Sequence, residues 1–104
     1  MSDRLFEQVK RKLNITWNDD DTNTRVTDII TAAIPTMIHK LGIADPAFDF
    51  SAEGTENTLF LNYCLYEYNH CVNEFDDNYK NDIAQTRNKH FVAYHTANEG
   101  VTDE

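Results

Sequence analysis

Apolar residues recur along most of the chain at the three- and four-residue spacing of amphipathic α-helices. In the first segment Leu5, Val9 and Leu13 fall four residues apart and so form one apolar stripe. Three consecutive basic residues, 10–12, flank this stripe, and Asn14 follows it. The pattern predicts a short helix with a basic flank that ends at Asn14.

A second and longer helical pattern follows the three aspartates at 19–21. Their side chains can supply oxygens and negative charge to the exposed amides at the start of a helix. The apolar positions behind them keep a helical period up to Gly42, where we expect the helix to end: Val26, Ile29, Ile30, Ala33, Ile34, Met37, Ile38 and Leu41. Pro35 lies inside this pattern and cannot donate a backbone hydrogen bond. We expect a kink there rather than two helices, because no capping residue precedes the proline.

The segment 43–54 lacks a helical period and predicts an ordered loop. It contains Pro46 and Gly54, and Phe48 and Phe50 alternate within it, which is compatible with a short extended piece. This loop would connect the second helix to a third.

Two further helices are expected in the second half of the chain. The third extends from about residue 55 to residue 73, and Asp76 and Asp77 can cap a fourth. The fourth would carry Tyr79, Ile83, His90, Phe91 and Tyr94. Residues 95–104 are polar and predict a flexible acidic C-terminal tail, which leaves residues 1–94 as the helical domain.

Together these elements predict an all-α fold, a small antiparallel bundle of about four helices with an ordered loop between the second and third. The apolar stripes predict one shared core, which we expect to contain Leu13, Ile30, Ile34, Tyr63 and Cys64. A chain of 104 residues with 40% hydrophobic content suits one domain that buries roughly 65% of the surface of its unfolded chain.

The chain is strongly acidic, with a formal net charge of −9. Affinity for phosphates comes from clustered Lys and Arg, so general electrostatic binding to nucleic acid or anionic membranes is not expected and protein partners are favoured. The sequence contains no apolar run near the roughly 20 residues needed to span a bilayer and no signal-peptide pattern. We therefore expect a protein that is made in the cytosol.

The sequence contains no motif for a metal site or a catalytic centre. In a calcium loop counted from Asp19, Thr24 and Ile30 would occupy the places where glycine and glutamate are needed. Cys64 and Cys71 would lie roughly 10 Å apart along one helix, too far for a disulfide, so free thiols are expected. The histidines lack the spacings of zinc sites. We expect no metal, no cofactor and no enzymatic activity.

Two segments resemble the small head-to-tail connector, or adaptor, proteins of tailed bacteriophages, which bind beneath the portal. The first joins the short basic helix, the turn Ile15-Thr16-Trp17 and the acidic cap. The second is the run LFLNYCLYEYNH at residues 59–70. With the order of the helices, the resemblance covers nearly the whole chain.

The resemblance implies a virion structural protein. Its subunits would form a homo-oligomeric ring, twelve-fold on the portal protein, that extends the DNA channel and offers a platform to the next head-completion or tail protein. DNA would pass without sequence-specific binding, and the protein would lie at the head-tail junction of the virion after assembly in the host cytoplasm. The C-terminal part would contact the portal, which points to Phe91, Tyr94 and Val101 as apolar anchors, with Phe48 and Phe50 as the alternative surface.

The acidic charge also fits an acidic helical interaction module, for example a DNA-mimicking inhibitor of a DNA-binding protein. The two hypotheses differ in where the carboxylates lie. An inhibitor would display them along one outer face, whereas a ring subunit would show apolar and mixed-charge flanks to two neighbours. The sequence alone leaves both open.

Overall fold

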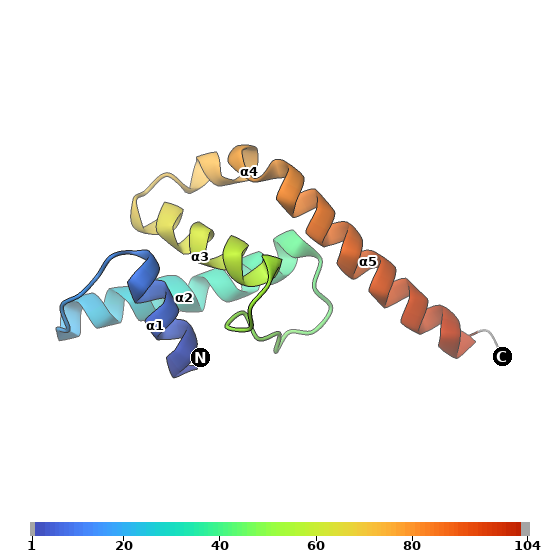
Figure 1. Ribbon diagram of the computed structural model, residues 1–104, viewed down its shortest axis with the longest axis horizontal. Coiled ribbons are helices and arrows are strands. Elements are labelled where there is room, and N and C mark those ends of the chain that lie inside the picture. Colours follow the sequence, from blue (N-terminus) through green and yellow to red (C-terminus); the bar gives the residue numbers. More distant parts are fainter. Residues whose placement is uncertain (1, 103–104) are drawn as a thin grey trace.

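The computed structural model describes residues 2–102, with side chains described as far as His95. In this part of the chain there are five α-helices, one 3₁₀ helix and no strand, so the predicted all-α fold is confirmed (Figure 1). The elements are α1 (Asp3–Lys12), α2 (Asp20–Leu41), α3 (Thr55–Tyr68), η1 (Val72–Glu74), α4 (Phe75–Asn78) and α5 (Lys80–Thr102).

The first two helices end and begin where local chemistry predicts. The backbone of Asn14 is left-handed, with a φ of 61°, and ends the turn that follows α1. Asp19 caps α2, because its Oδ1 accepts a hydrogen bond of 2.8 Å from the backbone N–H of Thr22. Gly42 ends α2 with a φ of 65°, and the helix continues through Pro35 as a single element.

The third helix is shorter than predicted, which changes the geometry of the two cysteines. It ends at Tyr68 rather than near residue 73, because His70 takes a left-handed conformation with a φ of 59°. Cys71 therefore lies beyond the helix and does not share a helical face with Cys64. Both thiols are free, and burial raises the pKa of Cys64 to about 12.

The fourth predicted helix differs from the observed one in how it begins and in where it ends. Asp76 and Asp77 lie inside the single-turn α4 and do not cap a helix; Asp76 instead pairs with Lys40 of α2 at 2.9 Å. The long helix α5 begins at Lys80 and extends to Thr102, so residues 95–102, which we expected in a tail, continue the helix. Residues 103 and 104 lie outside the described residues.

The loop between α2 and α3 is held by its own side chains, and its two phenylalanines do not form an extended strand. The ring of Phe48 meets that of Phe50 edge to face at 5.0 Å, and Phe50 stacks on Phe60 of α3 at 4.6 Å. Asp49 Oδ1 accepts hydrogen bonds from the backbone N–H and the hydroxyl of Ser51. The loop is therefore packed onto the core.

One hydrophobic core joins α1, α2, α3 and α4. Leu13, Ile30, Tyr63 and Cys64 belong to it, and the partly buried Ile34 packs against it. The fully buried side chains with the largest volumes are Phe50, Phe60, Phe75, Ile30, Met37, Leu41, Leu59, Val9, Val26 and Cys64.

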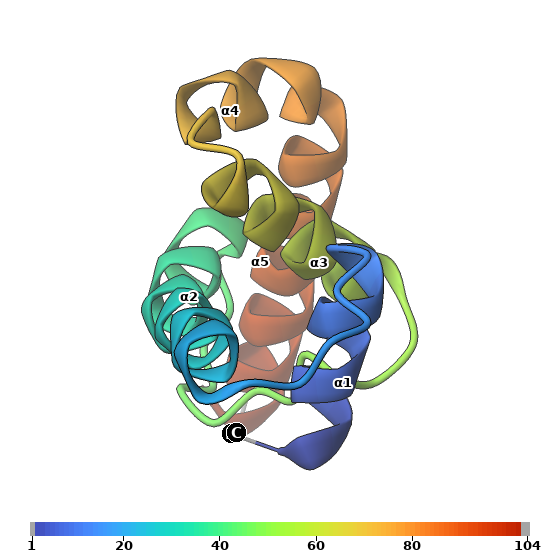
Figure 2. The same cartoon turned by 90° about the vertical axis from the view of Figure 1, so that its left-hand side faces the viewer.

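The molecule is elongated because α5 extends away from this core. Its extents are 56 × 28 × 19 Å and its radius of gyration is 15.4 Å, against about 13 Å for a compact domain of this length. Figure 1 shows the second half of α5 leaving the body, and Figure 2, the view along the long axis, places α1 and α2 on either side of it. The C-terminal part of the chain is thus a projecting helix.

Candidate functional site

Large apolar side chains are exposed at two separate places. Trp17, in the connection between α1 and α2, is 50% exposed, and on α5 the exposed fractions of Phe91, Val92 and Tyr94 are 60%, 51% and 54%. The two places lie toward opposite ends of the long axis (Figure 1). The cluster on α5 is of the kind that marks interaction sites, whereas Trp17 is a single exposed aromatic side chain.

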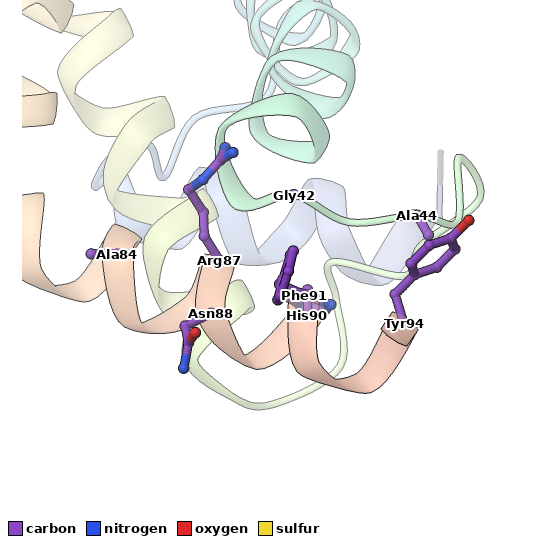
Figure 3. Close-up of a pocket in the computed structure, with 8 residues that line it drawn as sticks. All are labelled: Gly42, Ala44, Ala84, Arg87, Asn88, His90, Phe91 and Tyr94. Carbon is purple, nitrogen blue, oxygen red and sulfur yellow. The ribbon is translucent and has the colours of Figure 1, made fainter. Parts of the chain in front are cut away.

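The aromatic residues of α5 line an open groove with a volume of about 800 Å³. We call it the α5 groove; its lining residues are Gly42, Ala44, Ala84, Arg87, Asn88, His90, Phe91 and Tyr94. Figure 3 shows Arg87, Phe91 and Tyr94 projecting from α5 toward the segment that contains Gly42 and Ala44. One wall of the groove is therefore α5, and the other is the end of α2 with the loop behind it.

Arg87 holds the two walls of the groove together. Its Nη1 donates hydrogen bonds of 3.0 and 2.8 Å to the backbone carbonyls of His39 and Lys40, in the last turn of α2. Carbonyls at the end of a helix lack partners within the helix, and a cation there also interacts favourably with the helix dipole. The groove is thus built by the pairing of a side chain with a helix C-terminus.

A buried carboxylate fixes α5 on its other side. Glu56, in the first turn of α3, pairs with Lys89 and accepts a hydrogen bond of 2.7 Å from Nε2 of His90. Desolvation by burial raises the pKa of Glu56, but the hydrogen bonds from Lys89, its own backbone and His90 outweigh this effect, so the pKa lies below its usual value. The ring of His90 also meets that of Phe48 edge to face at 5.9 Å. The root of α5 is therefore anchored to α3 and to the loop.

The second exposed surface is a turn around Trp17, which we call the Trp17 turn (residues 15–22). The indole Nε1 donates a hydrogen bond of 2.9 Å to the hydroxyl of Thr22, and that hydroxyl donates one of 3.1 Å to Asp19 Oδ2. The carbonyl of Trp17 accepts a hydrogen bond of 3.1 Å from Nζ of Lys10, which is only 8% exposed. Both the backbone and the indole of Trp17 are thus held in place while half of the side chain faces solvent.

The two surfaces differ in charge. The Trp17 turn contains the aspartates at 19–21. Residues 80–95 contain three cations, Lys80, Arg87 and Lys89, against one carboxylate. Within the described residues the ion pairs join Lys40 to Asp76 and Glu56 to Lys89 and His90, and do not include Arg87. Of the three cations, only Arg87 lines the α5 groove, and no Asp or Glu lines it, so the groove carries a positive charge in an otherwise acidic chain.

The structure places the site residues that were expected from the sequence in different environments. Phe91 and Tyr94 do share one surface, the α5 groove. Phe50 is 1% exposed, so it belongs to the core and does not offer a docking surface, whereas Phe48 is half-buried beneath His90. The side chain of Val101 lies outside the described residues.

Sequence reasoning missed the exposure of Trp17 and the burial of Lys10. A signal for the first was present, since Trp17 lies outside both helical stripes, between a basic helix and an acidic cap. The second was hidden, because Lys10 occupies the basic flank of α1 and its Nζ is held by the carbonyl of Trp17 and by Asn23 of α2, contacts that helical periodicity does not show.

Comparison with protein-family models, with curated proteins and with solved structures finds no match for this chain. In the described part of the chain, no group of three or more His, Cys, Asp or Glu residues is arranged to hold a metal ion. The described helices also include none that is long and apolar enough to cross a membrane.

Proposed function

We propose that this chain is a subunit of the head-to-tail connector of a tailed bacteriophage, which forms a ring beneath the portal protein, extends the DNA channel and carries the next head-completion or tail protein. The observation that carries the proposal is the presence of exposed aromatic surfaces near both ends of an elongated helical subunit. A ring built by one rotation needs two different surfaces on each subunit, one for each neighbour. The resemblance in the segments around residues 15–21 and 59–70 supplies the biological setting.

The portal contact is proposed for the projecting end of α5. Phe91 and Tyr94 line the α5 groove, with Tyr94 beside Ala44 (Figure 3), whereas residues 95–102 continue the helix away from the body. A helix that leaves the core can reach a partner without disturbing the packing of its own subunit. We therefore place the portal contact beyond Tyr94.

The distribution of charge favours a connector over a DNA-mimicking inhibitor. An inhibitor would display carboxylates along one outer face, but here the exposed Asp76 is paired with Lys40 and Glu56 is buried. The exposed aromatic residues Trp17 and Phe91 fit protein contacts, in which aromatic residues are enriched. The net charge of −9 suits a channel whose lumen repels the DNA backbone and lets it slide.

Imaging with the portal protein of the same virion tests this function. The purified chain is mixed with the portal, and the particles are examined by negative-stain electron microscopy beside portal alone. The proposal predicts an added collar on one face of the portal. Portal particles that stay unchanged at a saturating excess of the chain would refute it, and capture of a DNA-binding protein in place of the portal would favour the inhibitor.

A further inference from the structure

We infer that the Trp17 turn of one subunit inserts into the α5 groove of a second copy of this chain, so that adjacent subunits are joined head to tail. The inference deepens the proposed ring and rests on it for its biological setting. It names the two surfaces that a subunit would offer to its neighbours.

The geometry requires a second copy. The connection between α1 and α2 lies near one end of the long axis and the α5 groove lies toward the other (Figure 1), along a molecule 56 Å in extent. The Trp17 turn therefore cannot fill the groove of its own chain. A contact between two different surfaces of identical subunits is heterologous, and it closes into a ring when the rotation between subunits allows.

The two surfaces are chemically complementary. The Trp17 turn presents a rigid indole, held by Thr22 and by Lys10, and a rigid aromatic group loses little conformational entropy when it binds. The groove offers the ring of Phe91 and two alanine side chains, Ala44 and Ala84, as apolar surface. Arg87 also lies there (Figure 3), and a guanidinium over an indole face is a favourable cation–π arrangement.

The charges of the two surfaces also favour contact between the Trp17 turn and the α5 groove. The exposed aspartates at 19–21 follow Trp17 in the chain, while the groove is lined by Arg87 and by no Asp or Glu. Like surfaces would repel, since two Trp17 turns or two grooves would bring charges of the same sign together. Opposite potentials across an interface select the correct partner and register, so the charges favour the head-to-tail contact over a symmetric dimer.

The single tryptophan of the chain allows a direct test in the full-length protein. Phe91→Asp puts a carboxylate into the groove and leaves the Trp17 turn intact, whereas Trp17→Ala removes the indole and leaves the groove intact. Each variant alone should associate at least tenfold more weakly than the natural chain, as expected for loss of a central aromatic anchor. Mixed together they should form a one-to-one dimer and nothing larger, because each has one working surface.

Fluorescence reports which surface is occupied in this mixture. Only the Phe91→Asp chain contains tryptophan, so addition of the Trp17→Ala chain should shift its emission to shorter wavelength as the indole enters the groove. The double variant Trp17→Ala, Val92→Asp is the matched control. Val92 is exposed on α5 but does not line the groove, so this acceptor should still produce the shift, whereas Trp17→Ala, Phe91→Asp should not.

Cross-linking gives a second readout that leaves both aromatic residues in place. Thr16 and Asn88 are exposed, next to the indole and in the groove. Chains with Thr16→Cys and chains with Asn88→Cys, treated with a short bismaleimide, should link to one another far more than either links to itself. The natural chain, which keeps Cys64 and Cys71, measures the background.

The outcomes separate this inference from the proposed function. Restored dimers with shifted emission and mixed cross-links support it. A natural chain that stays monomeric at about 1 mM, a mixture that restores nothing, or cross-links only between identical variants would overturn it. Portal binding is measured separately, so a collar on the portal that survives in both single variants would leave the connector standing and reject the contact.

Discussion

Single buried side chains decide whether this small core forms. Ile30 of α2 is fully buried and lies in the same cluster as residues of α1, α3 and α4. Its place could be predicted from helical periodicity, because a residue in the middle of a wide apolar stripe has no route to solvent. Periodicity could not place Lys10, whose burial depends on the turn at Trp17 and on Asn23 of α2.

We predict that Ile30→Asp abolishes folding. A carboxylate at this position would be buried without a partner, and the cost of burying an unpaired charge is comparable with the whole stability of a typical domain, about 5–15 kcal/mol. Far-ultraviolet circular dichroism and thermal melting measure the effect. Thr31→Asp, at the adjacent exposed position, is the control and should melt like the natural chain; equal melting of both variants would show that the core is assigned wrongly.

The contacts of Glu56 with Lys89 and His90 should give the stability of the folded chain a defined pH dependence. Because the pKa of Glu56 in the folded chain lies below its usual value of 4.5, the stabilisation is present above that value and is lost as pH falls through the folded pKa. Glu56→Gln should therefore cost about 1 kcal/mol near neutral pH. Denaturant unfolding of both chains at intervals from about pH 6 to about pH 3 checks this, and a constant difference across that range would argue against the pair.

At the scale of whole elements, a helix end that is fixed by its own capping residue could be predicted from the sequence. A helix end that depends on a tertiary contact could not. The oxygens of Asp19 and the left-handed Gly42 fix the ends of α2 locally. The end of α3 combines the left-handed His70 with a contact from another helix, because Arg25 of α2 donates a hydrogen bond to the carbonyl of Tyr68 and lies over its ring at 4.3 Å. Nothing in the sequence near His70 announces that contact, so the predicted helix extended too far.

The projecting end of α5 should be dispensable for folding and needed for docking. All of the anchors described for α5, namely Arg87, Lys89 and His90, precede residue 95. Deletion of residues 95–104 should therefore leave the circular dichroism of the core and the melting temperature nearly unchanged while it weakens attachment to the portal. Binding is measured by sedimentation with purified portal, and undiminished binding by the truncated chain would move the docking surface elsewhere on the subunit.

For the molecule as a whole, the fold class followed from the sequence but the shape did not. Four amphipathic patterns and the lack of alternation were enough to predict an all-α domain. The patterns did not show that α5 would leave the core, because the spacing of Phe91 and Tyr94 is equally compatible with a helix face that is buried in the core. The α5 groove depends on the contact of Arg87 with the end of α2. Arg87 lies 48 positions after His39 and 47 positions after Lys40, the two residues whose carbonyls it binds.

The central claim is that this chain acts as a ring subunit on the portal, and native mass spectrometry of the portal titrated with the chain tests it most directly. Head-to-tail contacts between neighbours make each added subunit favour the next, so binding should be cooperative. We predict two dominant species, the bare portal and the portal with one complete ring of chains, with few partly filled particles between them. A random distribution of single bound chains, or no increase in portal mass at all, would contradict the account.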